Sequence, residues 1–170
     1  KSAVRKPEDT HFLGFCFRKD KDGKQEIYVS RRTKERLVAK VVTLSPRTWG
    51  RSLRSCFEQC NSYLRGWIAY FRICSGKEVE RLLDHTDAHL RRRIRAIVIR
   101  QKKKPRHLLR FLLSLGARPN IAAKAAYSRR GIWPRSNVYG IRTTMSINWF
   151  STRLVSLLDH WREWQNQRSL

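Results

Sequence analysis

The sequence predicts a mainly α protein that begins with a short β-hairpin, continues into a three-helix bundle and ends in a smaller helical extension. Two short apolar segments near the N-terminus flank an Asp-Gly pair, which is typical of a hairpin turn. Three long segments with apolar residues at helical spacing follow, and the segments after Pro105 are shorter. Among the 170 residues, 41% are hydrophobic and six are tryptophan, so a folded core is expected.

The helical part is divided by residues that start or stop helices. Pro46 suits the first turn of the second helix, Ser75 and Gly76 end that helix, and Pro105 ends the third. Short connections favour antiparallel neighbours, so these helices are expected to share one core. The predicted strands lie at 11–17 and 25–29, and the predicted helices at 31–42, 46–73, 77–104, 107–115, 120–127 and from about 144, with an irregular basic segment at 128–137.

This reading gives three predicted domains. Residues 1–29 form a linker and the hairpin, residues 30–104 form the three-helix domain, and residues 105–170 form a basic helical extension.

The net charge of +25 arises from 38 Lys and Arg against 13 Asp and Glu. Such an excess points to a nucleic-acid partner, with an anionic membrane surface as the weaker alternative. No apolar run approaches the roughly 20 residues that span a bilayer, so no membrane partner is expected. The first ten residues are polar and charged, so no secretory signal is expected, and a start without Met is typical of a fragment or a processed product.

Cysteine spacing gives no sign of a redox or zinc motif. None of the four cysteines forms a Cys-x-x-Cys pair, so they are expected to be small buried hydrophobes in a reduced compartment. An alternative is a zinc site built from Cys56 and Cys60 with His85 and His89. The cysteines fall on the apolar side of their helix and the histidines on the polar side of theirs. The four are therefore not expected to converge, and no metal ligand is predicted.

The third predicted helix is the strongest candidate for binding. Nine Lys or Arg and no acid lie between Arg91 and Arg106, whereas a solvated helix face, the alternative, normally mixes both signs. Arginine predominates and suits bidentate phosphate contacts, and RNA duplexes are recognised mostly through backbone and shape. The predicted RNA-binding residues are Arg54, Arg65, Arg72, Arg91, Arg92, Arg93, Arg95, Arg100, Lys102, Lys103, Lys104, Arg106, Arg129 and Arg130.

Three aromatic residues are candidates for base stacking, with packing against the protein as the alternative. Tyr63 and Tyr70 lie at the edge of the apolar stripe of the second helix, and Trp133 lies among arginines. Asp87 projects near the apolar stripe of the third helix, where Arg65 or another arginine of the second helix is expected to neutralise it.

Three segments carry a family resemblance. They are Phe-Leu-Gly-Phe at 12–15, Leu-Arg-Gly-Trp-Ile-Ala-Tyr-Phe at 64–71, and Leu-Arg-Arg-Arg-Ile-Arg at 90–95. In this order and spacing, residues 12–104 resemble the C-terminal part of group II intron reverse transcriptases, the multifunctional maturases. The tail is similar more loosely, through 128–133 and 148–150.

The resemblance implies different roles for the hairpin and for the three helices. The hairpin resembles the last strands of the polymerase palm, and the three helices resemble the thumb, or maturase-specific region. In this family the thumb grips the template–primer duplex and binds structured intron RNA, which promotes splicing. The implied partners are therefore intron RNA, template–primer duplex and the upstream palm and fingers.

The resemblance also locates the family's chemistry outside this chain. The aromatic-Ala-Asp-Asp turn that binds Mg²⁺ is expected upstream, in the palm, and Asp20 and Asp22 are interpreted as solvated turn residues. No catalytic residue and no cofactor are therefore predicted here, and the chain alone is not expected to polymerise DNA. The cysteine pairs of the family's optional HNH-type endonuclease are missing.

Two other functions fit the same sequence. The module could belong to a host-recruited reverse transcriptase, CRISPR-associated or active in repair, or the chain could be a basic ribosome-associated structural protein. The expected location is the bacterial cytoplasm, with an organelle as the less favoured place.

Overall fold

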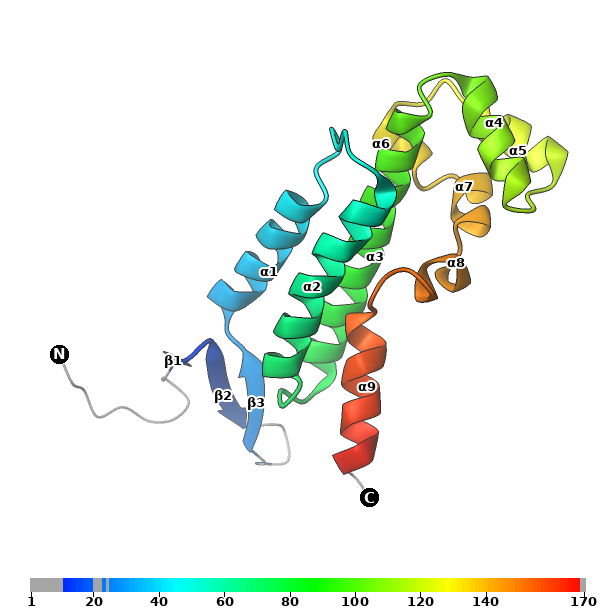
Figure 1. Ribbon diagram of the computed structural model, residues 1–170. Coiled ribbons are helices and arrows are strands. Elements are labelled where there is room, and N and C mark those ends of the chain that lie inside the picture. The colour runs from blue at the N-terminus through cyan, green and yellow to red at the C-terminus, as the bar shows by residue number, and fades with distance from the viewer. Residues whose placement is uncertain (1–10, 20–22, 24, 169–170) are drawn as a thin grey trace. The chain divides into compact units, whose positions relative to one another are not determined.

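A computed structural model describes residues 11–19, 23 and 25–168 of the chain, and it confirms the predicted mainly α class. Backbone contacts divide the chain into two compact units. Unit 1 contains the described residues within 1–41, 62–87 and 156–170, and unit 2 contains 42–61 and 88–155. Three long helices contribute residues to both units (Figure 1): α1 (Arg31–Leu44), α2 (Leu53–Phe71) and α3 (Lys77–Gln101).

Unit 1 begins with an antiparallel sheet in the order β1-β2-β3. Its strands are β1 (His11–Phe12), β2 (Phe15–Lys19) and β3 (Gln25–Val29). The predicted strand at 11–17 is therefore wrong in one respect, because the chain reverses at Leu13 and Gly14, whose φ angles are 49° and 90°. This two-residue turn pairs Phe12 with Phe15. The expected linker at 1–10 and most of the expected turn at 19–23 lie outside the described residues.

Gly14 joins the tight turn to α1 and α2. Its carbonyl oxygen accepts hydrogen bonds from the backbone N–H of Ser30 (2.8 Å) and from the Thr33 hydroxyl (3.2 Å). A Cβ at Gly14 would lie 2.8 Å from Thr33 Oγ1 and 3.3 Å from Phe71 Cζ. The glycine is therefore required both by its positive φ and by this close approach.

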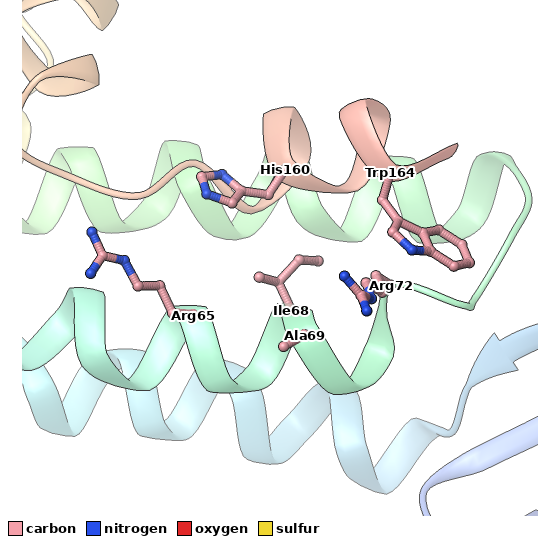
Figure 2. A pocket seen from close by; sticks show the side chains of 6 residues that line it. All are labelled: Arg65, Ile68, Ala69, Arg72, His160 and Trp164. Carbon is pink, nitrogen blue, oxygen red and sulfur yellow. The ribbon is translucent and has the colours of Figure 1, made fainter. Parts of the chain in front are cut away.

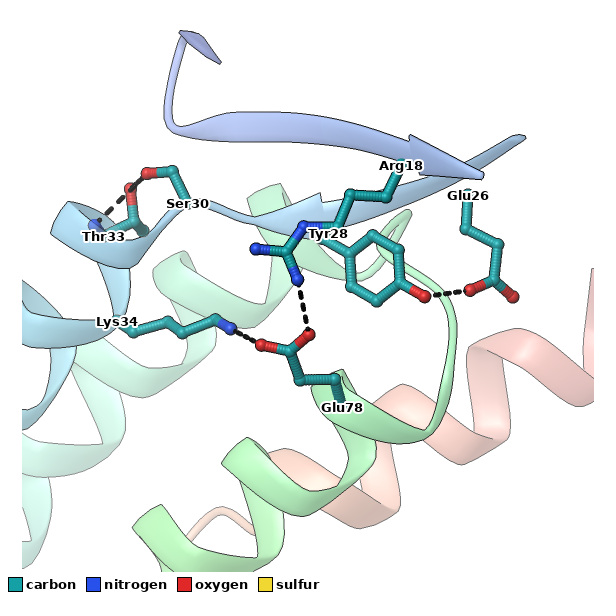
Figure 3. A network of polar contacts seen from close by, with 7 residues as sticks. All are labelled: Arg18, Glu26, Tyr28, Ser30, Thr33, Lys34 and Glu78. Carbon is teal, nitrogen blue, oxygen red and sulfur yellow. Dashed lines mark hydrogen bonds and ion pairs between the residues drawn. The ribbon is translucent and has the colours of Figure 1, made fainter. Parts of the chain in front are cut away.

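Ion pairs connect the sheet to the helices of unit 1 (Figure 3). Glu78, in the first turn of α3, accepts from Arg18 of β2 at 3.2 Å and also from Lys34 of α1. The hydrogen bond from Lys34 is the main reason why the pKa of Glu78 lies below its usual value. Ser30 begins α1, where its Oγ accepts from the backbone N–H of Thr33 at 3.3 Å.

The core of unit 1 forms where α2 and α3 pack with α9 (Leu157–Arg168). The rings of Trp67 and Phe71 stack with centroids 4.6 Å apart. Trp161 of α9 is buried, and its indole N–H donates to the carbonyl oxygen of Cys74 at 2.8 Å. Other buried apolar side chains of this core are Val29, Leu37, Leu64, Ile68, Val79, Leu83 and Leu157.

Asp87 of α3 fixes the start of α9. Its buried carboxylate accepts from the Ser156 hydroxyl (2.9 Å) and from the backbone N–H groups of Leu157 (3.1 Å) and Leu158 (3.2 Å). It thus acts as an N-cap supplied by another helix and satisfies donors that a helix start leaves open. The sequence predicted an arginine partner and missed this role. It also predicted one last helix from about 144, which in the structure is interrupted before Ser156.

Unit 2 contains five shorter helices besides its parts of α1, α2 and α3. They are α4 (Pro105–Ser114), α5 (Pro119–Ala126), α6 (Ile132–Arg135), α7 (Tyr139–Thr144) and α8 (Ile147–Ser151). The predicted irregular segment at 128–137 therefore contains the short helix α6. The predicted second helix begins later than expected, because residues 46–52 form a loop. The core of unit 2 includes Ile94, Ile97, Val98, Leu108, Leu112, Ile141, Met145 and Phe150.

All four cysteines are free thiols and buried, which confirms their predicted packing role. Among the described residues, no helix combines the length and the apolar character needed to cross a membrane.

Replacing Gly14 by Ala is expected to destabilise the protein by about 1–3 kcal/mol, because the added Cβ meets Thr33 while the backbone stays strained. Urea unfolding followed by circular dichroism measures this. Gly23→Ala is the matched control, since Gly23 also has a positive φ but a Cβ there would meet nothing within 4 Å. If both variants lose the same free energy of unfolding, the close approach of the added Cβ to Thr33 does not destabilise the protein.

Replacing Asp87 by Ala is expected to lower the free energy of unfolding by about 1–2 kcal/mol, the upper range for loss of a helix cap. Amide hydrogen exchange should accelerate at the start of α9, at Leu157 and Leu158. The control is Asp159→Ala, an exposed acid in the first turn of α9. Unchanged exchange at Leu157 in the Asp87 variant would contradict the capping role.

Candidate nucleic-acid interface

Positive charge is concentrated in unit 2. This unit holds 20 of the 38 Lys and Arg residues, whereas Glu58 is its single acid among the 13 of the chain. Every residue of the unit lies in the described part of the chain, and the stretch from 88 to 155 contains no acid at all. So much uncompensated charge gives the surface a strong positive potential that attracts polyanions.

The densest group lies where α3 ends and α4 begins. We call Arg100, Lys102, Lys103, Lys104 and Arg106 the α3–α4 basic cluster. All are exposed except Lys102, which is half-buried with its Nζ 4.7 Å from the centre of the Phe111 ring. The φ of Lys103 is 47°, so the chain turns sharply here.

The start of α4 adds to the attraction for anions at this cluster. Pro105 occupies the first turn of α4, and the side chain of the preceding Lys104 makes no capping hydrogen bond. Helix N-termini carry partial positive charge and attract phosphate groups. The cluster therefore combines side-chain cations with a helix terminus that favours anions.

Gln101 brings a loop to the same end of α3. Its amide nitrogen donates to the carbonyl oxygens of Trp49 (3.3 Å) and Arg51 (2.8 Å). The exposed side chains of Arg47 and Arg51 belong to this loop. These two arginines are not among the predicted RNA-binding residues, because only the tertiary contacts of Gln101 place their loop beside the basic cluster.

Arg93 is a structural residue. Its side chain is buried, with 8% exposed, and it donates to the carbonyl oxygens of Val42 (3.1 Å) and Ser45 (2.7 Å) and to the Ser45 hydroxyl (2.9 Å). These oxygens lie at the C-terminal end of α1, where helix carbonyl groups lack partners within the helix. Burial lowers the pKa of the Arg93 guanidinium.

Arg95 has a similar role. It is 6% exposed, and both Nε (3.1 Å) and Nη2 (2.8 Å) donate to the carbonyl oxygen of Met145. Its guanidinium also lies 5.4 Å from the centre of the Phe150 ring. Burial is the main cause that lowers the pKa of Arg95 to about 10. Arg93 and Arg95 were both predicted to bind RNA, but they are buried and their guanidinium groups hold main-chain carbonyl oxygens of the protein itself.

The other predicted RNA contacts differ in accessibility. Arg54 is exposed but forms an ion pair with Glu58, one helical turn away at 3.0 Å. Arg91 and Arg92 are half-buried. Arg129 and Arg130 are exposed in unit 2, and Arg65 and Arg72 are exposed in unit 1. Their contact with RNA stays a prediction.

Trp133 is partly covered by the protein itself. The guanidinium of Arg92 lies 4.1 Å from its ring centre and donates to the Trp133 carbonyl oxygen at 3.3 Å. Arg47 approaches the same ring at 5.7 Å. A base could therefore stack on Trp133 only by displacing one of these arginines.

The two tyrosines differ from Trp133 and from each other. Tyr70 is 47% exposed, stacks on Phe15 at 5.2 Å and donates its hydroxyl to the Leu13 carbonyl oxygen at 3.2 Å. Tyr63 is half-buried, with Lys40 5.9 Å from its ring centre, and burial raises the pKa of its hydroxyl. Of the three predicted stacking residues, Tyr70 leaves the most surface for a ligand.

The described residues contain no group of three or more His, Cys, Asp or Glu side chains that could hold a metal ion. The expectation that the chain needs no cofactor remains a prediction.

Comparison with known families agrees with the predicted resemblance. Residues 34–112 match the family described as group II intron, maturase-specific domain. The match runs from α1 into α4 and includes the whole α3–α4 basic cluster. Comparison with curated proteins gave no match. Residues 34–112 of this chain thus belong to the group II intron maturase-specific domain family.

Proposed function

We propose that this chain binds structured RNA of a group II intron through the α3–α4 basic cluster and the exposed arginines around it, and thereby supports splicing. The observation that carries the proposal is the uncompensated charge of unit 2, which lies largely within the family match. Binding would bring phosphate groups between cations that now repel one another. The protein would thus gain attraction to the ligand and lose internal repulsion.

The residue types favour recognition of the RNA backbone. Arg100 and Arg106 offer planar guanidinium groups for bidentate phosphate contacts, and the lysines add point charges. Trp133 is half-buried beneath Arg92, which leaves little of its own ring for base stacking. We therefore expect unit 2 to recognise the shape and phosphate spacing of folded RNA.

We further propose that the same module holds a template–primer duplex when it is joined to a palm and fingers. The polymerase chemistry would belong to those domains, to which the family resemblance assigns the paired aspartates that bind Mg²⁺. The role of this chain would be to bind and orient the duplex. Primer extension by the chain alone is not part of the proposal.

Replacing Arg100, Lys103 and Arg106 together by Gln is expected to weaken binding to a structured group II intron RNA. Three lost phosphate contacts should flatten the slope of log affinity against log salt by about 2 to 3. All three side chains are exposed, so the variant should remain folded. Filter binding at several salt concentrations measures the slope.

The matched control replaces Arg32, Arg36 and Arg81 by Gln. These exposed arginines lie in unit 1, and the change in net charge is the same. A loss of slope in the control equal to that in the cluster variant would show that only net charge matters. An unchanged slope in a folded cluster variant would refute the proposed contact.

Replacing Arg95 by Met tests the distinction between structural and binding arginines. Loss of the guanidinium leaves the buried Met145 carbonyl oxygen without that donor, so the free energy of unfolding should fall by about 1–3 kcal/mol. Measured well below the unfolding temperature, the RNA affinity and its salt slope should stay close to those of the unchanged protein. A stable variant with weakened RNA binding would instead assign Arg95 to the interface.

A further inference from the structure

A groove of about 160 Å³ lies in unit 1 between α2 and α9 (Figure 2). On α2 its lining residues follow helical spacing, so that Arg65, Ile68, Ala69 and Arg72 form one stripe. On α9 it is lined by His160 and Trp164, one helical turn apart. Arg65, Ala69, Arg72 and His160 are all exposed, so the groove is accessible from solvent.

The two arginines of the groove are available to an anion. Among the ion pairs of the described residues, none involves Arg65 or Arg72. The groove itself contains no acidic side chain. Seven residues of helix separate the two arginines by about 10.5 Å along the axis, so their guanidinium groups can hold phosphates on either side of a bound base.

Between the arginines the groove is apolar, and the aromatic ring of Trp164 lies next to Arg72 (Figure 2). Ile68 is buried and Ala69 carries only a methyl group, which leaves room above the helix. The half-buried ring of Trp164 has the guanidinium of Arg72 5.5 Å from its centre and that of Arg168 at 5.3 Å. A base that stacks on this ring would take the place of Arg72, whose exposed side chain is long enough to turn to the adjoining phosphate.

His160 adds a polar group to the groove. Its Nδ1 lies 3.0 Å from the carbonyl oxygen of Ser156, which can only accept, so Nδ1 carries the proton. This contact leaves Nε2 for a ligand. A neutral His160 would thus offer an acceptor toward a base edge.

We propose that this groove binds one unpaired nucleotide of the RNA, with the base on Trp164 above Ile68 and Ala69 and the flanking phosphates on Arg65 and Arg72. The inference rests on the proposed RNA binding, and it specifies an unpaired nucleotide as the part of the RNA that this groove binds. The groove is smaller than the roughly 300–1,000 Å³ of pockets that enclose drug-sized ligands, so it suits the planar base of that nucleotide, with the sugar and the phosphates outside it. A paired base does not expose its face, so duplex RNA cannot fill the groove in this way.

The test compares two RNAs with the same stem. One carries a short single-stranded overhang that contains 2-aminopurine, a base whose fluorescence falls when it stacks, and the other is blunt-ended. The unchanged protein should quench the 2-aminopurine and bind the overhang RNA more tightly. One stacked base should contribute roughly 5-fold to 100-fold in affinity.

Ala69→Leu fills the space above the helix without removing charge. The site is exposed and Leu is a good helix former, so the fold should persist. This variant should lose the quenching and bind both RNAs with equal affinity. Ala39→Leu, at an exposed position on α1 in the same unit, is the control and should behave like the unchanged protein.

A second variant tests the phosphate contacts. Replacing Arg65 and Arg72 by Gln should flatten the salt slope for the overhang RNA by about 1.4, at roughly 0.7 for each contact with a single strand. The slope for the blunt RNA should change less. Arg36→Gln with Arg81→Gln is the control of equal charge outside the groove.

The outcomes separate this inference from the proposed function. If the protein binds both RNAs but Ala69→Leu keeps full quenching and the preference for the overhang, the groove inference is wrong and the RNA-binding proposal stands. If the unchanged protein binds neither these RNAs nor a structured intron RNA, the proposed function itself fails.

Discussion

Repulsion among the cations of unit 2 is the constraint on which the rest of its structure depends. With one acid against twenty bases, this unit cannot neutralise its arginines with carboxylates. It uses two other kinds of partner. Arg93 and Arg95 donate to main-chain carbonyl oxygens, and Arg92, Lys102 and Arg153 lie over aromatic rings at 4.1, 4.7 and 4.8 Å.

This solution determines which cations remain for a ligand. A guanidinium buried on carbonyl oxygens has its donors satisfied, and moving it to a phosphate would leave those oxygens unpaired. The cations at helix ends and in loops, such as Arg51, Arg100 and Arg106, carry no such cost. The binding surface of unit 2 therefore consists of the exposed cations that make no structural contacts with carbonyl oxygens. The position of an arginine along α3 therefore does not show whether it belongs to this binding surface.

The sequence predicted the helical class, the long helices and the family. Apolar periodicity and the motif at 64–71 are patterns of residues that lie close together in the chain, so they can be recognised without the fold. It did not separate Arg93 and Arg95 from Arg91 and Arg92. Four nearly consecutive arginines look alike in sequence. Arg93 and Arg95 differ because they are buried against the carbonyl groups of Ser45 and Met145, about 50 residues away. The capping role of Asp87 was missed for the same reason, since the helix start that it caps is contributed by residues 156–158.

Twelve of the 13 acids of the chain lie outside unit 2. Several acids of unit 1 make structural contacts. Glu78 forms ion pairs with Arg18 and Lys34, and Glu80 forms one with Arg162. Asp87 accepts hydrogen bonds from the start of α9. Because these carboxylates have partners within unit 1, they do little to offset the charge elsewhere. Arg65 and Arg72 lie in the same unit, and neither takes part in the ion pairs of the described residues. Arg65 and Arg72 thus carry charge beside an aromatic groove, where the phosphates of a bound nucleotide would meet them.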